Sequence, residues 1–287
     1  MDIGVLRERK LDEHRVALQP VQIPVLRSDG HAVWVETGAG AQAGFTDEEY
    51  LRGGARITDR EEIYRRCELL LKVKVPIPSE VPFLEPRHTL FTFLHFDENL
   101  PVDRLNDLLA RGFTGLAFEW VQEAGRFPLL EPMSRLTGYL FAQKAAELCS
   151  RHKGVLCARH EDGLNEPAQA LVIGCGQIGL SVLRSCMRNG YGIHVVDKHP
   201  ETLDDRINQR FGTRGIRYVE DHGLQVIPFR VEEMERCLDG IRAVLPRMDN
   251  LFNCAVRRSD LPKSRLEFLV TAAMVSTMGP GSVVCDT

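Results

Sequence analysis

The sequence predicts an α/β protein made of two doubly wound domains, each built on a mainly parallel sheet. Short apolar runs alternate with helical stretches along most of the chain, which is typical of parallel strands covered by helices on both faces. A glycine-rich turn after one such run indicates that the second domain is of the Rossmann type. With 287 residues, the chain is long enough for two domains. We expect a first domain at 1–127, a connecting helix and linker at 128–167, and a Rossmann domain at 168–287.

The composition is that of an ordinary globular protein and argues against several classes. Hydrophobic residues make up 44% and charged residues 26%, and the net charge of −4 leaves no basic excess for nucleic acid. No apolar run is long enough for a membrane span, and no signal-peptide pattern is present. The eight cysteines form no C-x-x-C pair, so we expect neither a metal site nor a disulfide framework. We expect a cytoplasmic protein.

In the first domain, short apolar runs predict strands and the stretches between them predict helices. The expected strands cover residues 3–6, 32–35, 69–75, 89–95 and 114–118. The expected helices cover residues 20–28, 46–53, 59–67 and 102–111. The second of these helices opens with a capping box in which Thr46 precedes Glu49.

The second half is predicted to open with a long helix at 135–152, which Ser134 caps and which joins the domains. A polar stretch at 161–167 predicts a loop, and the nucleotide domain proper is expected to start near Ala168. Its later strands are expected at 223–227, 250–255 and 282–285.

The motif at 174–179 (GCGQIG) has the G-x-G-x-x-G spacing of a dinucleotide-binding turn between a strand and a helix. Gly174 permits the tight turn, Gly176 lets the backbone approach a pyrophosphate, and Gly179 lets helix and strand pack closely. Gln177 and Ile178 lie at the start of the helix, where free N–H groups face the phosphates.

An acidic residue stands where this fingerprint needs one. Asp197 ends the next apolar run, 23 residues after Gly174, and can accept hydrogen bonds from the adenosine ribose. Its charge would repel a 2′-phosphate, so the sequence favours NAD over NADP. Lys198 and His199 follow directly and either weaken that preference or are simply solvated.

Polar residues in the strands of the first domain suggest a second site. Lys72 and Lys74 lie in an apolar strand, where alternation would put both on one face, and Lys74 is near the carboxyl end. Lysine can hold or polarise a carbonyl, whereas Lys72 is better explained as a structural or snorkelling residue. His95 ends the next strand and can move protons near neutral pH, although a hydrogen-bonded histidine at a strand end explains it equally well.

Arg15 follows the first strand, where a guanidinium could grip a carboxylate with two parallel hydrogen bonds. Taken alone, it would be an ordinary surface arginine.

Six ordered segments resemble the family of alanine dehydrogenases and proton-translocating transhydrogenases. They are residues 13–20 (EHRVALQP), 35–40 (VETGAG), 44–50 (GFTDEEY), 70–76 (LLKVKVP), 90–95 (LFTFLH) and 128–134 (PLLEPMS). Saccharopine dehydrogenase and carboxyethyl-ornithine synthase look like more distant members.

The resemblance implies an NAD-linked enzyme that interconverts amino acids and 2-oxo acids, with the first domain binding the substrate. It implies that Arg15 binds the substrate carboxylate, that Lys74 contacts the carboxylate and carbonyl region, and that His95 is catalytic. It also implies that Ser134 lies near the cofactor and that Asp197 binds the ribose. We further expect a homo-oligomer.

Several positions depart from the family pattern. Val75 replaces a glutamate, and residues 96–99 (FDEN) replace a small apolar run. Residues 252–255 (FNCA) are closer to the saccharopine and carboxyethyl-ornithine enzymes, and Arg257 and Arg258 replace an apolar loop. These departures keep open an opine-type reductive coupling of a 2-oxo acid with an amine.

The last residues also differ from the family. Asp286 matches the family's structural first aspartate, and the catalytic second aspartate and the following helices are not in this sequence. We therefore expect a Rossmann domain that is incomplete at its C-terminus, with oligomerisation or low activity as a result. A nucleotide-binding remnant without catalysis is the third hypothesis.

Overall fold

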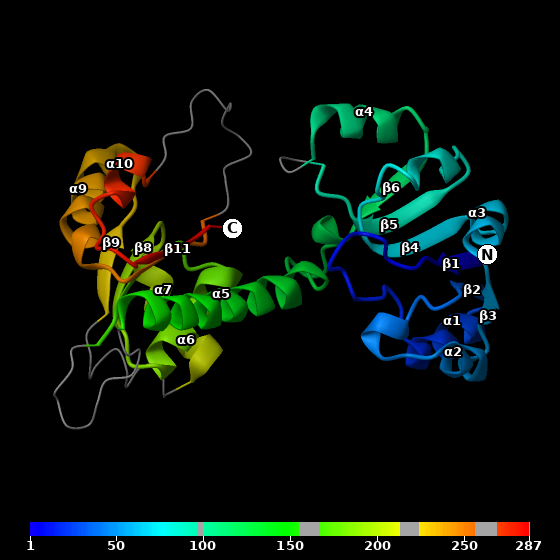
Figure 1. The fold of residues 1–287 in the computed structure, drawn as a ribbon, viewed down its shortest axis with the longest axis horizontal. Helices are drawn as coiled ribbons and strands as arrows, with labels where there is room; N and C mark the ends of the chain where they lie inside the picture. The colour runs from blue at the N-terminus through cyan, green and yellow to red at the C-terminus, as the bar shows by residue number, and fades with distance from the viewer. Residues whose placement is uncertain (97–99, 155–166, 213–223, 256–268, 287) are drawn as a thin grey trace. The chain divides into compact units, whose positions relative to one another are not determined.

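The computed structural model describes residues 1–96, 100–154, 167–212, 224–255 and 269–286. The chain divides into two compact units, Met1–Leu130 and Glu131–Thr287, each with one parallel sheet between helices (Figure 1). The predicted fold class is therefore confirmed, and the finer division at 1–127, 128–167 and 168–287 stays a prediction. In the part of the chain that the structure describes, no helix is both long and apolar enough to cross a membrane.

The sheet of the first unit has six strands in the order β3-β2-β1-β4-β5-β6. The strands are β1 (Asp2–Val5), β2 (Ala32–Glu36), β3 (Arg56–Thr58), β4 (Leu69–Lys74), β5 (Thr89–Phe93) and β6 (Thr114–Ala117). Five of them match the predicted runs to within two residues at each end. The sixth, β3, was not predicted, because three residues at a sheet edge are too few to show a period.

Helices cover both faces of this sheet. On one face lie α1 (Ile23–Ser28) and α2 (Asp47–Gly53), whose buried Ile23 and Tyr50 pack with strand residues of β1 and β2. On the other lie α3 (Arg60–Arg66) and α4 (Val102–Leu109). The predicted capping box is present at the start of α2, where the Thr46 hydroxyl accepts the Glu49 amide and the Glu49 carboxylate accepts the Thr46 amide.

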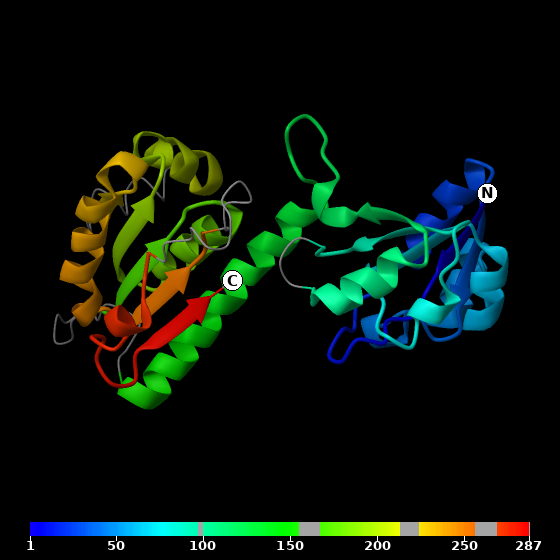
Figure 2. The same cartoon turned by 90° about the horizontal axis from the view of Figure 1, so that it is seen from above.

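The sheet of the second unit has five strands in the order β11-β10-β7-β8-β9. The strands are β7 (Gln169–Ile173), β8 (Gly192–Asp197), β9 (Gln225–Pro228), β10 (Asn250–Asn253) and β11 (Val283–Asp286). One face packs against α5 (Leu130–Lys153), α6 (Gln177–Arg188) and α7 (Leu203–Phe211). The other packs against α9 (Met234–Val244) and α10 (Ala272–Val275) (Figure 2).

The long helix α5 begins earlier than the sequence predicted. It starts at Leu130, so Ser134 lies in its second turn and is not the N-cap. Pro132 lies in the first turn of the helix, where proline removes no intrahelical hydrogen bond and is tolerated. The helix belongs to the second unit, where Ala142, Ala145 and Cys149 are buried.

Both sheets have a point where the strand order reverses. In the first unit β1 lies between β2 and β4, and in the second β7 lies between β8 and β10. Open α/β sheets bind ligands beyond the carboxyl ends of the strands at such points. The loop that carries Arg15 follows β1, Lys74 ends β4, and the glycine turn follows β7, so these residues lie at the switch points. His95 follows β5 and Asp197 ends β8, each one strand further along.

An irregularity in β4 overturns the prediction that Lys72 and Lys74 share a face. Leu71 pairs with Phe91 but Lys74 pairs with Phe93, so β4 carries one extra residue between the two pairs. Because side chains alternate along a strand, the extra residue puts Lys74 on the face of Leu71 and Phe93, opposite to Lys72.

Buried charges hold this bulge. Glu8 accepts the amides of Val73 and Lys74 with one carboxylate oxygen, and its other oxygen lies 3.5 Å from the Lys72 Nζ. Lys72 also donates to both oxygens of Glu80 at 2.9 and 3.0 Å. All three side chains are nearly or fully buried. Lys72 is therefore structural and does not snorkel.

Breaking this buried triad should strongly destabilise the first unit. Lys72→Met would leave Glu8 and Glu80 buried together without their cation, which typically costs about 3–5 kcal/mol. Both tryptophans, Trp34 and Trp120, lie in the first unit, so urea unfolding followed by tryptophan fluorescence reports on this unit. The control Arg65→Met removes an exposed ion pair and should leave the midpoint nearly unchanged. Equal losses in the two variants would contradict a structural role for the triad.

Candidate functional site

Arg15 is held in a defined orientation by its neighbour Glu13. The Glu13 carboxylate accepts the Arg15 Nε at 2.7 Å and Nη2 at 2.6 Å, and it also accepts the Arg15 backbone amide at 3.0 Å. Burial acts to raise the pKa of Glu13, but these bonds outweigh it and lower that pKa. The same bonds raise the pKa of Arg15. One edge of the guanidinium fork is therefore anchored, and the exposed head of this residue is a fixed cation.

Lys74 lies near Arg15 at the carboxyl edge of the same sheet. Its Nζ stands 5.9 Å from the centre of the Phe93 ring, a cation–π distance. Partial burial lowers the pKa of Lys74, and the positive charges of Arg15 and Lys10 lower it further, whereas Glu13 and Glu8 oppose them. Two cations near one another, one of them partly desolvated, make an environment that favours an anionic ligand.

His95 follows β5 in a left-handed backbone conformation, with φ of +50°. The buried carboxylate of Glu119 accepts the His95 amide at 2.6 Å and the Leu94 amide at 3.2 Å. The imidazole stacks on Phe93, with 5.9 Å between the ring centres and 15° between the planes. Phe93 therefore contacts both Lys74 and His95, and it links the ends of β4 and β5.

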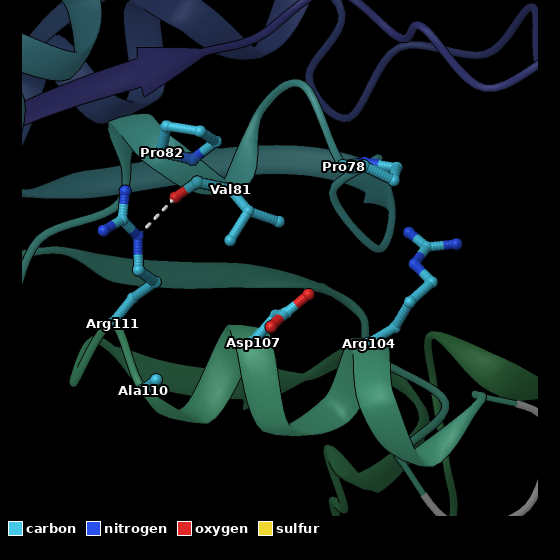
Figure 3. A pocket seen from close by; sticks show the side chains of 7 residues that line it. All are labelled: Pro78, Val81, Pro82, Arg104, Asp107, Ala110 and Arg111. Atoms are coloured by element: carbon cyan, nitrogen blue, oxygen red, sulfur yellow. Dashed lines mark hydrogen bonds between the residues drawn. The ribbon is translucent and has the colours of Figure 1, made fainter.

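A surface hollow of about 400 Å³ lies elsewhere in the first unit, between the turn at Val81–Phe83 and α4 (Figure 3). It is lined by Pro78, Val81, Pro82, Arg104, Asp107, Ala110 and Arg111. Arg104 and Arg111 donate to backbone carbonyls of Pro76 and Val81, at 2.8 and 2.9 Å. Because Arg15, Lys74 and His95 do not line this hollow, it is separate from the candidate site.

The glycine turn of the second unit has the geometry that a dinucleotide phosphate needs. Gly174 adopts φ of +83°, and a Cβ on Gly179 would stand 1.9 Å from the Gly174 carbonyl oxygen. A Cβ on Gly176 would meet nothing within 4 Å, so open space adjoins the turn there. The N-cap of α6 is Gly176, which has no side chain to cap the first amides of the helix. The turn therefore fits the pyrophosphate of a dinucleotide.

Asp197 lies at the end of β8 and is fully engaged with its own unit. One oxygen accepts the Cys175 amide at 2.8 Å, and the other accepts the His199 amide at 2.8 Å and Arg206 Nη2 at 2.7 Å. Burial acts to raise the pKa of Asp197, but these three donors outweigh it, so the pKa lies below its usual value. The carboxylate stays ionised and is paired with a cation that the sequence did not predict.

The second and third turns of α5 lie close to the first turn of α6. A Cβ on Gly138 would stand 2.3 Å from the Ile178 carbonyl oxygen, so only glycine permits this packing. Arg135, which follows Ser134, donates to the Gln177 side chain at 3.3 Å. Arg210 donates to the same oxygen at 2.6 Å. Ser134 lies one turn before Gly138 on α5.

Sequence reasoning missed three residues that position the predicted ones: Glu13, Glu119 and Arg206. Glu13 was in the quoted motif, and its spacing of two residues from Arg15 was the available signal. Glu119 and Arg206 are 24 and nine residues from their partners, and nothing in the sequence pattern marks those pairs. The departures at 97–99, Arg257 and Arg258, and the predicted loop at 161–166, lie outside the described residues.

Comparisons with known proteins give matches along the whole chain. Residues 4–137 match the family described as "Alanine dehydrogenase/PNT, N-terminal domain", and residues 142–287 match "Alanine dehydrogenase/PNT, C-terminal domain". The alanine dehydrogenase of Methanococcus maripaludis is 31% identical over 291 residues, covering 100% of this chain and 71% of that protein. The alanine dehydrogenase of Bacillus subtilis is 32% identical over 290 residues, covering 100% and 70%.

Solved structures show the same likeness. A structure of L-alanine dehydrogenase superposes with a TM-score of 0.78 at 28% identity, covering 100% of this chain and 73% of the other. The transhydrogenase from Sinorhizobium meliloti superposes with a TM-score of 0.74 at 23% identity, covering 99% and 77%, and shows the shared fold.

The strained backbone at residue 95 gives a test of the site geometry. A left-handed conformation costs a residue with a Cβ roughly 1–2 kcal/mol but costs glycine almost nothing. His95→Gly should therefore be more stable than His95→Ala by about 1 kcal/mol in urea unfolding of the first unit. At Arg65, inside α3, the same two substitutions should rank in the opposite order. A more stable alanine variant at both positions would rule out the left-handed backbone at His95.

Proposed function

The chain belongs to the alanine dehydrogenase/PNT family over nearly its whole length, and we propose that this protein is an NAD-dependent amino-acid dehydrogenase. It interconverts an amino acid and a 2-oxo acid at the C–N bond, and pyruvate with ammonia is the first substrate pair to test. The observation that carries the proposal is the gathering of Arg15, Lys74 and His95 at one sheet edge. The comparisons favour neither opine-type coupling nor a non-catalytic remnant.

The site residues would divide the work by their chemistry. The anchored guanidinium of Arg15 would bind the substrate carboxylate. Lys74, whose pKa is lowered by burial and by Arg15, would sit at the carbonyl or imine end and favour negative charge on it. His95 would exchange a proton with the group on the α-carbon, since imidazole titrates near neutral pH. Glu119 would orient that imidazole by holding the His95 backbone amide, and Phe93 by stacking on the ring.

The glycine turn and its neighbours would hold the cofactor. Gly174, Gly176 and Gly179 leave the backbone room, and the first amides of α6 at Gln177 and Ile178 would face the pyrophosphate. Asp197 would lie at the ribose and Ser134 near the same cofactor. When bound, the nicotinamide supplies a hydride acceptor or donor for the substrate's α-carbon.

We also propose that the chain forms a homo-oligomer. Leu136 and Leu140 are exposed one helical turn apart on α5, and contiguous exposed apolar surface is typical of protein–protein contacts. Light scattering at several protein concentrations tests this. A monomer at all of them would exclude a stable oligomer.

Removal of the imidazole should affect turnover without disturbing the backbone. Asparagine tolerates the left-handed conformation, so His95→Asn should keep the fold while kcat falls by ~10²–10⁴, as expected for loss of a general acid–base group. The assay is NADH oxidation with pyruvate and ammonia. The control His152→Asn, at the exposed end of α5, should leave kcat unchanged. A change in KM alone would instead make His95 a binding residue.

Arg15 should govern affinity for the 2-oxo acid. Arg15→Lys keeps the charge but loses the fork that matches a carboxylate, so KM for pyruvate should rise roughly 10- to 100-fold, as for loss of a charge-assisted hydrogen bond. The control Arg65→Lys on α3 should change nothing. An unchanged KM for pyruvate in the Arg15 variant would remove this residue from the substrate site.

A further inference from the structure

A guanidinium covers the carboxylate that the fingerprint assigns to the ribose. Arg206, on α7, donates through Nη2 to Asp197 at 2.7 Å. The Arg206 side chain is 28% exposed and that of Asp197 only 5%. Of the two partners, the cation is therefore the one that solvent or a ligand meets.

Arg206 is held in place by more than this ion pair. Its Nη1 donates to the carbonyl of Cys175, inside the glycine turn, at 2.7 Å. Its Nη2 also donates to the carbonyl of His199 at 2.9 Å. The Nε is buried and has no hydrogen-bond partner among the described residues. The guanidinium thus bridges the turn after β7 and the loop after β8, where the adenosine ribose of a dinucleotide binds.

The charge around Asp197 differs from that of a bare carboxylate. An unpaired carboxylate about 4 Å from a 2′-phosphate repels each of its charges by roughly 1–4 kcal/mol, depending on solvent. In this protein the positive charge of Arg206 lies 2.7 Å from the Asp197 carboxylate and opposes its negative charge. Exposed Lys198 adds a second cation, while Glu201 lies beside His199, 3.4 Å away. Arg210 adds a third cation one turn further along α7 and reaches Gln177 on α6.

We infer that Arg206 lets the ribose end accept a 2′-phosphate, so that the protein binds NADP as well as NAD. Beyond the three hydrogen bonds described above, Arg206 has one further Nη1 N–H and its positive charge, and an arginine near this position is the usual device for a 2′-phosphate. The inference rests on the proposed function, since it requires that the glycine turn binds a dinucleotide. Arg206 is then the residue that sets the preference between the two cofactors.

Titration of the full chain with NADH and with NADPH, followed by calorimetry, tests the inference on the wild type. We expect the two dissociation constants to agree within tenfold. A preference of more than tenfold for NADH would overturn the inference and leave the proposed function intact. Binding of neither cofactor would overturn the proposed function as well.

Substitutions identify the responsible residue. Arg206→Leu should weaken the binding of NADPH at least tenfold relative to that of NADH. Arg206→Lys, which keeps the charge, should recover part of that loss of affinity. The matched control Arg188→Leu, in the exposed last turn of α6, removes the same charge and should leave the ratio unchanged. NADH affinity serves as the check on folding. If Arg206→Leu binds neither cofactor, the test is the ratio of the NADPH and NADH dissociation constants in Arg206→Lys. A ratio equal to that of the wild type would overturn the role of the guanidinium.

Discussion

The first unit depends on a buried ion triad. Lys72 is enclosed between Glu8 and Glu80, and the same Glu8 accepts the amides of Val73 and Lys74 at the bulge in β4. Buried charges are tolerated only when they are paired and hydrogen-bonded, so the three groups require one another. The bulge they hold reverses the alternation of side chains and places Lys74 beside Phe93. The arrangement at the sheet edge therefore follows from a polar network beneath it.

In the second unit, close backbone contacts position the candidate site, as the ion triad does in the first unit. Gly179 and Gly138 lie where any Cβ would collide with a carbonyl oxygen, of Gly174 and Ile178 respectively. The start of α6 is thus pressed against the strand before it and against α5. This packing leaves the first amides of α6 at the edge of the turn, where a pyrophosphate can accept them. Asp197 and Arg206 lie at the same edge, where Asp197 accepts the Cys175 amide and Arg206 donates to the Cys175 carbonyl.

The candidate residues of both units are each held by a carboxylate. Glu13 orients Arg15, Glu119 holds the backbone of His95, and Asp197 meets Arg206. Each pairing fixes a side chain or a backbone segment that would otherwise be mobile, which is what precise contact with a small anionic substrate or cofactor requires. The family likeness extends over both units, with residues 4–137 and 142–287 matching the two family models.

The sequence by itself determined the α/β class, nearly all strands, the glycine turn and the identity of the candidate residues. It could do so because periodicity, capping boxes and glycine spacing are local signals. Only the tertiary structure decided which face Lys74 occupies, what holds His95, and which cation covers Asp197. One extra residue in β4 reverses a face without changing the apolar pattern, and the partners Glu119 and Arg206 are remote in sequence from the residues they contact. Such contacts arise when strands pair and helices pack, and no local sequence pattern specifies them.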